Sequence, residues 1–298
     1  MPRMPWNDLP APVRAAIERE CGQILRVESL SAGRNSDFSA ILHTTDGSVF
    51  CKGVAGVSGK REELHRHEVL INSWLPRAVT PRLLWILDVE DWSLLGFEHV
   101  PGHHADLSPG SPDLPLVLDA VNLLARELAV CPVLLPQLAN KITWMAGWRR
   151  LRHDPPKNLD GWSRCHLNEF VAWEQCAADA VRGTSLLHTD LHPLNILVAD
   201  RARIVDWAWS RRGAGWTDAA HLVVRLIDRG HPPGQAERWA AETAAWSEAG
   251  DEDLTSFAVA LLGMWTYLEF RDPQPHRRRL TEAARTWARH RLTAGAGR

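Results

Sequence analysis

Three side chains in the middle of the chain have the types and the spacing that phosphoryl transfer requires. Asp190 is followed five residues later by Asn195, and a short apolar run then leads into Asp206. A carboxylate beside an attacking hydroxyl can orient it and accept its proton, and carboxylate and amide oxygens are suitable Mg²⁺ ligands beside nucleotide phosphates. The pattern therefore predicts Asp190 as the catalytic base, and Asn195 and Asp206 as ligands of a magnesium ion.

A lysine upstream is placed to neutralise phosphate charge. Only four lysines occur in the chain, and Lys52 ends an apolar run that starts at Val49. This placement resembles that of the kinase lysine that contacts the α- and β-phosphates. On the helix expected next, Glu68 is the preferred partner because it lies mid-helix beside apolar residues, and Glu62 and Glu63 are the alternatives.

A turn at residues 31–36, with Gly33 inside it, lies between two expected strands. Kinases place the loop over the phosphates at this point, and the backbone N–H groups of Asn35 and Ser36 can cup a phosphate there. An ordinary hairpin turn is the alternative. Residues 53–60 also look glycine-rich, but they fail the spacing of a P-loop.

Residues 94–102 form an apolar strand that runs into a Pro-Gly exit. The segment resembles the hinge of the protein-kinase-like fold, and this resemblance implies that backbone groups near Glu98 and Val100 hydrogen-bond a purine, with Phe97 at the back of the base pocket. A plain edge strand is the alternative.

The sequence around these residues resembles the aminoglycoside phosphotransferase and choline kinase family. That family's usual motif reads His-Gly-Asp-Leu-His-x-x-Asn, followed later by Ile-Asp-Trp. The resemblance runs from roughly residue 30 to 226, and it implies a two-lobed, protein-kinase-like fold that uses ATP or GTP with Mg²⁺. The matching positions are His188, Asp190, His192, Asn195, Asp206 and Trp207.

Two positions of the loop depart from the family pattern. Thr189 and Leu194 stand where the family often has glycine, which puts loop geometry and substrate fit in doubt more than catalysis. His188 and His192 lie four residues apart and could be read as zinc ligands, but histidines that brace the loop fit the neighbouring acidic residues better.

The surrounding elements predict an α+β fold. We expect helices at 10–20 and 60–75 and hairpins at 38–52 and 83–100. After 116 the chain is expected to be mainly helical, with helices at 142–151 and 167–181 among others and short strands in its middle. The expected domains are a sheet-rich nucleotide-binding lobe at 1–98 and a helical catalytic and acceptor-binding lobe at 99–298, with the nucleotide between them.

Charge and composition narrow the functional classes. The net charge of −2 offers no basic field for nucleic acid, and no apolar run is long enough to cross a membrane. No signal peptide is expected at the N-terminus. Five cysteines without a CxxC motif indicate reduced thiols and a cytoplasmic protein.

The acceptor is the open question. A small molecule such as an antibiotic or an amino-alcohol metabolite is the first hypothesis, with antibiotic resistance as one role. The alternatives are a peptide Ser/Thr kinase, with or without phosphate elimination, and a non-catalytic pseudokinase. Residues 218–269 are rich in carboxylates, which would favour an acceptor with an amine if they line a cleft, and are otherwise a solvated helix face. Within that segment, Asp218 is expected to be a structural helix N-cap.

Overall fold

The computed structural model describes residues 3–31, 35–56 and 59–295. These fall into two compact units. The first contains the chain up to Ala105 together with Pro193–Trp209, and the second contains Asp106–His192 and the chain from Ser210 onward. The structure therefore divides the chain differently from the expected boundary between 98 and 99.

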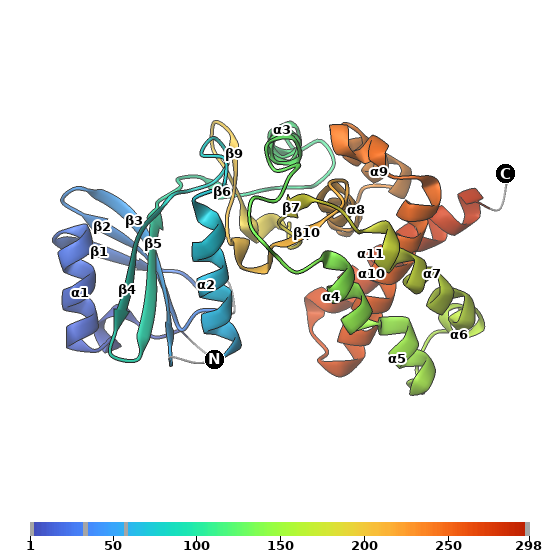
Figure 1. Cartoon of the computed structure of the whole chain (residues 1–298), viewed down its shortest axis with the longest axis horizontal. Helices are drawn as coiled ribbons and strands as arrows, with labels where there is room; N and C mark the ends of the chain where they lie inside the picture. The colour runs from blue at the N-terminus through green and yellow to red at the C-terminus, as the bar shows by residue number, and fades with distance from the viewer. Residues whose placement is uncertain (1–2, 32–34, 57–58, 296–298) are drawn as a thin grey trace. The chain divides into compact units, whose positions relative to one another are not determined.

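The first unit is built on a five-stranded antiparallel sheet with the strand order β1-β2-β3-β5-β4. Helices α1 and α2 lie on opposite faces of this sheet (Figure 1). The elements of the sheet and its helices are η1 (Trp6–Asp8), α1 (Ala11–Cys21), β1 (Ile24–Ser29), β2 (Phe38–Thr44), β3 (Gly47–Ala55), α2 (Lys60–Asn72), β4 (Leu83–Val89) and β5 (Trp92–Glu98).

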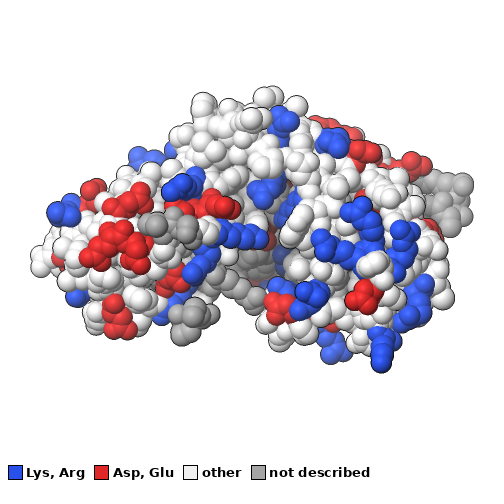
Figure 2. Space-filling view, turned by 60° about the horizontal axis from the view of Figure 1, so that its bottom comes forward, with Lys and Arg blue, Asp and Glu red and all other residues white. Residues whose placement is uncertain are grey.

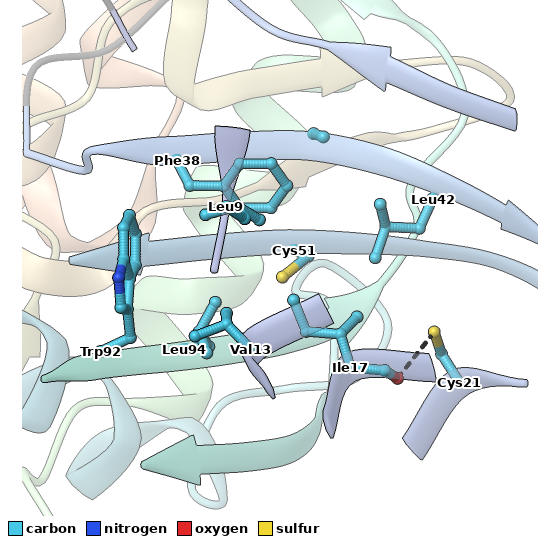
Figure 3. Close-up of a cluster of buried hydrophobic side chains, with 10 residues drawn as sticks. Leu9, Val13, Ile17, Cys21, Phe38, Leu42, Cys51, Trp92 and Leu94 are labelled. Carbon is cyan, nitrogen blue, oxygen red and sulfur yellow. Dashed lines mark hydrogen bonds between the residues drawn. The ribbon is translucent and has the colours of Figure 1, made fainter. Parts of the chain in front are cut away.

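Alternation along the strands decides which side chains face each helix. Phe38 and Leu42 of β2 and Cys51 of β3 join Val13 and Ile17 of α1 in one buried cluster (Figure 3). Because successive side chains of a strand point to opposite faces, the neighbour of Cys51 must face away from α1. That neighbour is Lys52, so the core pattern of β3 directs the lysine toward the face that α2 covers.

The segment that carries Asn195 and Asp206 folds with the first unit through short strands. Strand β8 (Ile196–Val198) pairs with β6 (His103–His104) and with β9 (Ala202–Ile204). The Ile204 N–H donates to Val79 O at 2.7 Å. Two 3₁₀ turns flank these strands, η2 (Pro193–Asn195) and η3 (Trp207–Trp209). Such long-range pairings explain why the boundary is not a single point in the sequence.

The second unit is mainly helical. Its two short strands, β7 (Ser185–Leu187) and β10 (Arg211–Gly213), pair antiparallel. Its helices are α3 (Asp113–Glu127), α4 (Leu138–Met145), α5 (Gly147–His153), α6 (Gly161–Cys165), α7 (Leu167–Ala180), α8 (Thr217–Asp228), α9 (Pro233–Ala241), α10 (Asp251–Arg271) and α11 (Pro275–Gly295), with η4 (Ala244–Glu248) before α10.

One expected helix is divided in two. Ala146 has a left-handed backbone (φ 39°) that ends α4, and Gly147 then starts α5. A Cβ on Gly147 would lie 2.2 Å from Gly263 O of α10, so only glycine permits this close helix contact. The sequence expectation of a single helix at 142–151 is wrong for this reason.

On the face drawn in Figure 2, basic and acidic side chains both occur among uncharged ones. Among the described residues, no helix is long and apolar enough to cross a membrane.

Candidate active site

Lys52 is the centre of a buried charge cluster in the first unit. Its ammonium group forms an ion pair with the Glu68 carboxylate and lies 3.4 Å from Asp206 Oδ1. The side chains of Lys52 and Glu68 are only 9% and 4% exposed. The alternatives for the partner are engaged elsewhere or point outward, because Glu62 pairs with Arg66 and Glu63 is exposed. The structure thus joins Lys52 to Glu68.

Electrostatics keep this lysine charged. Burial lowers the pKa of Lys52, but the negative charges of Asp206 and Glu68 outweigh burial and raise it above its ordinary value. Burial raises the pKa of Glu68, and the Lys52 charge and the backbone N–H of Trp207 oppose that rise. An ammonium group fixed between two carboxylates is a preformed partner for phosphate oxygens.

Asn195 and Asp206 are tied together through the backbone. The Val205 N–H donates to Asn195 O at 2.9 Å, which brings the residue before Asp206 against the end of η2. Asp206 has a left-handed backbone (φ 62°), and its side chain is 33% exposed. Within the described chain, no group of three His, Cys, Asp or Glu side chains could hold a metal by itself.

The expected phosphate turn is only partly visible, because residues 32–34 lie outside the described residues. Asn35 and Ser36 are half-buried, and the Ser36 hydroxyl is 3.5 Å from His65 Nε2 on α2. Burial, with the nearby Lys52 charge, lowers the pKa of His65 to about 3. A neutral histidine thus supports the end of this turn, a role that sequence reasoning missed.

The end of the same turn is held by Asp37. Its carboxylate accepts the Ala55 N–H at 3.0 Å and forms an ion pair with Arg61 of α2. Its own N–H donates to Gly53 O at 2.8 Å, directly beside Lys52. These contacts fix Ser36 relative to the lysine strand.

Of the three residues expected to contact the purine, Glu98 has its backbone N–H engaged elsewhere. Phe97 packs near Phe50, with ring centroids 6.2 Å apart. The Glu98 N–H donates to Arg82 O at 2.8 Å, and its carboxylate lies 3.5 Å from Arg203, so this N–H is already engaged in the sheet. Val100 is buried, and in the described part of the chain its N–H finds no backbone acceptor. Val100 is consequently the better candidate donor to a base.

In the second unit, the buried carboxylate of Asp218 anchors the loop that carries Asp190. The N–H groups of His188 and Thr189 donate to the two oxygens of Asp218, at 2.7 and 2.8 Å. The Asp190 N–H donates to His188 Nδ1 at 3.2 Å. Thr189 has φ 61°, a left-handed conformation that a β-branched residue adopts only at a cost in energy. This explains why glycine would suit the position.

Asp190 is held in its ionised form. Burial raises its pKa, but the hydrogen bond and charge of His192 outweigh burial, and His188 and Arg225 add to the effect, so the pKa lies below its ordinary value. His192 Nε2 is 3.7 Å from Asp190 Oδ2, and the Asp190 side chain is 34% exposed. An ionised, partly exposed carboxylate can accept a hydrogen bond from a hydroxyl.

Asp218 is not the helix N-cap that the sequence suggests. Helix α8 begins at Thr217, its N-cap is Trp216, and Asp218 lies inside the first turn with its carboxylate directed to the loop. Sequence reasoning therefore placed Asp218 in a structural role but missed that it positions the residues next to Asp190. The signal available in the sequence was an aspartate in the first turn of a mainly apolar helix.

Several other carboxylates between 218 and 269 have partners inside the second unit. Asp228 pairs with Arg279, Glu237 and Asp251 both pair with Arg291, and the Asp253 carboxylate accepts the Gly250 N–H at the start of α10. Glu242, Glu248 and Glu252 are exposed, and Glu269 is half-buried. Several carboxylates of residues 218–269 therefore make contacts within the second unit.

Known proteins share both the sequence pattern and the fold. A sequence profile described as the phosphotransferase enzyme family matches residues 36–258. No curated protein sequence matches the chain. Among solved structures, a thermostable mutant of aminoglycoside phosphotransferase APH(4)-Ia, in complex with AMP-PNP and hygromycin B, is similar over 94% of this chain and 99% of its own, with 15% identity and a TM-score of 0.64.

Two further structures show the same likeness. The choline kinase LicA from Streptococcus pneumoniae is similar over 93% of this chain and 99% of its own, with 14% identity and a TM-score of 0.63. Aminoglycoside phosphotransferase APH(3'')-Id from Streptomyces rimosus, in complex with ADP and streptomycin, covers 86% of this chain and 99% of its own, with 21% identity and a TM-score of 0.54. These likenesses confirm the two-lobed, protein-kinase-like α+β fold, and the profile match over residues 36–258 shows that the chain belongs to the phosphotransferase enzyme family.

Proposed function

We propose that this protein transfers the γ-phosphate of ATP or GTP to a hydroxyl group of a small molecule. The observation that carries the proposal is the buried Lys52 ammonium held between the carboxylates of Glu68 and Asp206. Burying a charge is costly, and buried charges with opposed partners are concentrated at functional sites. The two carboxylates hold the Lys52 ammonium group in place, and this group can also donate to the negatively charged oxygens of a triphosphate.

The first unit supplies the proposed nucleotide contacts. Lys52 neutralises charge on the phosphates, and Glu68 fixes its position. The backbone of Asn35 and Ser36 contacts the phosphates. Phe97 and the backbone at Glu98 and Val100 surround the base, with Val100 as the donor.

Asn195 and Asp206 fit a magnesium ion that arrives with the nucleotide. Their oxygens are the hard ligands that Mg²⁺ prefers, and Mg²⁺ commonly binds through one or two protein side chains plus substrate phosphates. When bound, the ion supplies neutralisation of phosphate charge. Asp206 also faces Lys52, so the aspartate can bind one cation while remaining next to another.

Asp190 acts on the acceptor. The acceptor oxygen forms a bond to the γ-phosphorus while the bond from that phosphorus to the bridging oxygen of the diphosphate breaks, which yields a phosphate ester and a nucleoside diphosphate. The hydroxyl proton passes to Asp190 and then to solvent. Because its pKa is lowered, Asp190 is a weak base, and its larger contribution is to orient the hydroxyl before its proton becomes acidic.

The acceptor is proposed to be a hydroxylated small molecule, with an antibiotic or an amino-alcohol metabolite as the leading classes. An amine on the acceptor is supported only by the carboxylates of residues 218–269 for which the described chain shows no ion pair or hydrogen bond. These are Glu242, Glu248, Glu252 and Glu269. All five cysteines are free thiols, which supports a reducing compartment and hence the cytoplasm.

A screen for γ-phosphate transfer tests the proposal. The protein is incubated with Mg²⁺ and γ-labelled ATP or GTP against a library of hydroxylated metabolites and antibiotics, with Asp190→Asn as the matched control. Label on a small molecule with the wild-type protein alone supports the proposal. Label on a peptide Ser or Thr would make the protein a peptide kinase, and nucleotide binding without transfer to any acceptor would make it a pseudokinase.

A further inference from the structure

A pocket in the second unit is lined by residues of helices α4, α5, α7, α8 and α10 (Figure 1). Its floor consists of almost fully buried side chains, among them Leu138, Phe257 and Leu261. Its rim consists of residues that are only partly buried, namely Lys141, Ile142, Met145, His221 and Met264. With the open space at its mouth included, the pocket measures about 410 Å³. A concave and mainly apolar surface of this size is suited to a small molecule.

His221 gives this pocket a hydrogen-bond acceptor. Its Nδ1 lies 2.8 Å from Thr217 O, one turn earlier on α8. Because a carbonyl oxygen only accepts, Nδ1 must carry the proton, and a neutral ring then leaves Nε2 as an acceptor. Burial outweighs the Asp218 charge and lowers the pKa of His221 to about 4, so the ring is neutral at pH 7. Within the described chain Nε2 has no hydrogen-bond partner, and it is not enclosed by protein.

The charges around the pocket do not favour a cationic ligand. Among the described lining residues, Glu174 supplies the one carboxylate, and its two oxygens accept the Trp148 and Arg149 N–H groups at 2.9 and 3.2 Å. This carboxylate therefore holds the start of α5. Lys141 adds a positive charge at the rim. An ammonium group bound here would lose water beside another cation and apolar walls, which is costly.

Helix α8 connects the pocket to the loop of Asp190. Asp218 and His221 are three residues apart, so they occupy neighbouring positions on one side of this helix. The Asp218 carboxylate accepts the N–H groups of the two residues directly before Asp190. The same two turns of α8 thus position both the proposed base and the rim of the pocket.

The floor of the pocket also lies next to the strand that leads into this loop. A Cβ placed on Gly213 of β10 would lie 3.3 Å from Leu138 Cβ and 2.7 Å from Leu187 Cδ1. Leu138 belongs to the pocket floor, and Leu187 is the last residue of β7, directly before the loop. The pocket and the loop of Asp190 are therefore built on the same strand pair.

We infer that this pocket binds a neutral molecule with an apolar body and a hydroxyl group that donates to His221 Nε2. The inference deepens the proposed function and rests on it in one respect: if the protein transfers phosphate as proposed, this molecule is the acceptor. A second hydroxyl of the same molecule then lies at Asp190. Among the proposed acceptor classes, this selects neutral hydroxylated compounds over amino alcohols and polyamines.

Binding of three small probes in the absence of nucleotide, measured by ligand-observed NMR titration, tests the inference. Phenylethylene glycol carries a ring and two hydroxyls, ethylene glycol lacks the ring, and phenylglycinol has an amine in place of one hydroxyl. We expect phenylethylene glycol to bind at least about tenfold more tightly than either of the others. Burial of the ring favours it over ethylene glycol, and desolvation of the ammonium beside Lys141 disfavours phenylglycinol.

Variants of the rim assign the binding to this pocket. Met264→Trp fills the pocket from its rim and should weaken binding of phenylethylene glycol about tenfold. His221→Phe keeps a ring but removes Nε2, and should weaken it about fivefold, whereas His221→Gln offers an amide oxygen and should recover part of the loss. Leu268→Trp is the matched control, because Leu268 is a half-buried residue one turn further along α10 that does not line the pocket.

The outcomes separate failure of the inference from failure of the proposed function. Equal binding of phenylethylene glycol to the wild type and to Met264→Trp, or wild-type binding no tighter than that of ethylene glycol, would overturn the inference. Tighter binding of phenylglycinol would overturn it as well, because the ligand would then be a cation. If the probes and variants behave as expected but no hydroxylated compound receives a phosphate, the pocket stands and the proposed function fails. Thermal unfolding of each variant shows whether the fold is intact.

Discussion

Asp206 and Asp190 occupy contrasting surroundings. Asp206 belongs to a cluster in which Lys52 and Glu68 are almost fully buried and oppositely charged. Asp190 is exposed to the same extent as Asp206, about a third, but it is held by histidines and by a loop whose N–H groups bind Asp218. The first arrangement is held by charge, and the second by backbone geometry.

The difference suggests how each group is used. A preformed charge cluster binds a ligand of fixed charge strongly but tolerates little variation. A partly exposed carboxylate on a backbone scaffold can receive acceptors of different shape. Changes in the first unit should therefore affect nucleotide binding, and changes around Asp190 should affect transfer.

The largest expected effect comes from Asp206→Ala. Without this carboxylate, magnesium-dependent nucleotide binding and turnover should both be lost, because the proposed ion keeps only Asn195. Titration with MgATP and with metal-free ATP measures the effect. A variant that binds MgATP like the wild type would remove Asp206 from the metal site.

Lys52 and Glu68 should act as one unit. A double-mutant cycle of Lys52→Ala and Glu68→Ala, measured as ATP affinity, should give a coupling free energy of about 1–3 kcal/mol, because either single change leaves the other charge without its partner. Glu63→Ala is the control on the exposed side of the same helix. Additive effects of the two changes would show that Lys52 and Glu68 do not act as one functional unit.

Asp218→Ala should impair the other region. Removing the carboxylate takes away the acceptor to which the His188 and Thr189 N–H groups donate. The loop should therefore shift and kcat should fall about tenfold, while ATP affinity is unchanged. Asp218→Asn keeps one acceptor oxygen and should lose less. An equal fall in ATP affinity would contradict the assignment of Asp218 to the transfer side.

Acid should destabilise the fold through a histidine in each unit. Burial lowers the pKa of His65 to about 3 and that of His221 to about 4. The unfolded chain then binds the proton more readily, so each contribution to stability is complete above pH 6.5 and is lost as the pH falls toward the folded pKa. At pH 5 the loss should be about 2 kcal/mol for each histidine.

Thermal unfolding at pH 7 and pH 5 measures this loss. His65→Gln should lessen the difference between the two pH values, and His153→Gln, at an exposed position, should not. The same pH difference in wild type and His65→Gln would show that His65 does not carry the effect.

The sequence predicts the local elements well where short-range signals exist. The hairpin of β2 and β3, helix α1 and the placement of Lys52 on a strand of that hairpin follow from turn residues and apolar spacing. That Lys52 faces away from α1 becomes evident only from the packing of β3. The choice of Asp190, Asn195 and Asp206 follows from residue chemistry and from the resemblance, and their roles remain predictions.

Long-range contacts explain what the sequence does not predict. The packing of Pro193–Trp209 with the first unit depends on β8 pairing with β6, almost one hundred residues away. In the sequence, Asp218 looks like a helix cap, because the N–H groups that it accepts from lie about thirty residues upstream and give no local signal.

The central claim is tested most directly by comparing binding and transfer in Asp190→Asn. The variant should bind MgATP with wild-type affinity and transfer the γ-phosphate to the acceptor found in the screen at least about 10²-fold more slowly, because the hydroxyl loses its orienting carboxylate. Wild-type transfer by Asp190→Asn, or a loss of MgATP binding equal to that of Asp206→Ala, would contradict the separation of the two roles.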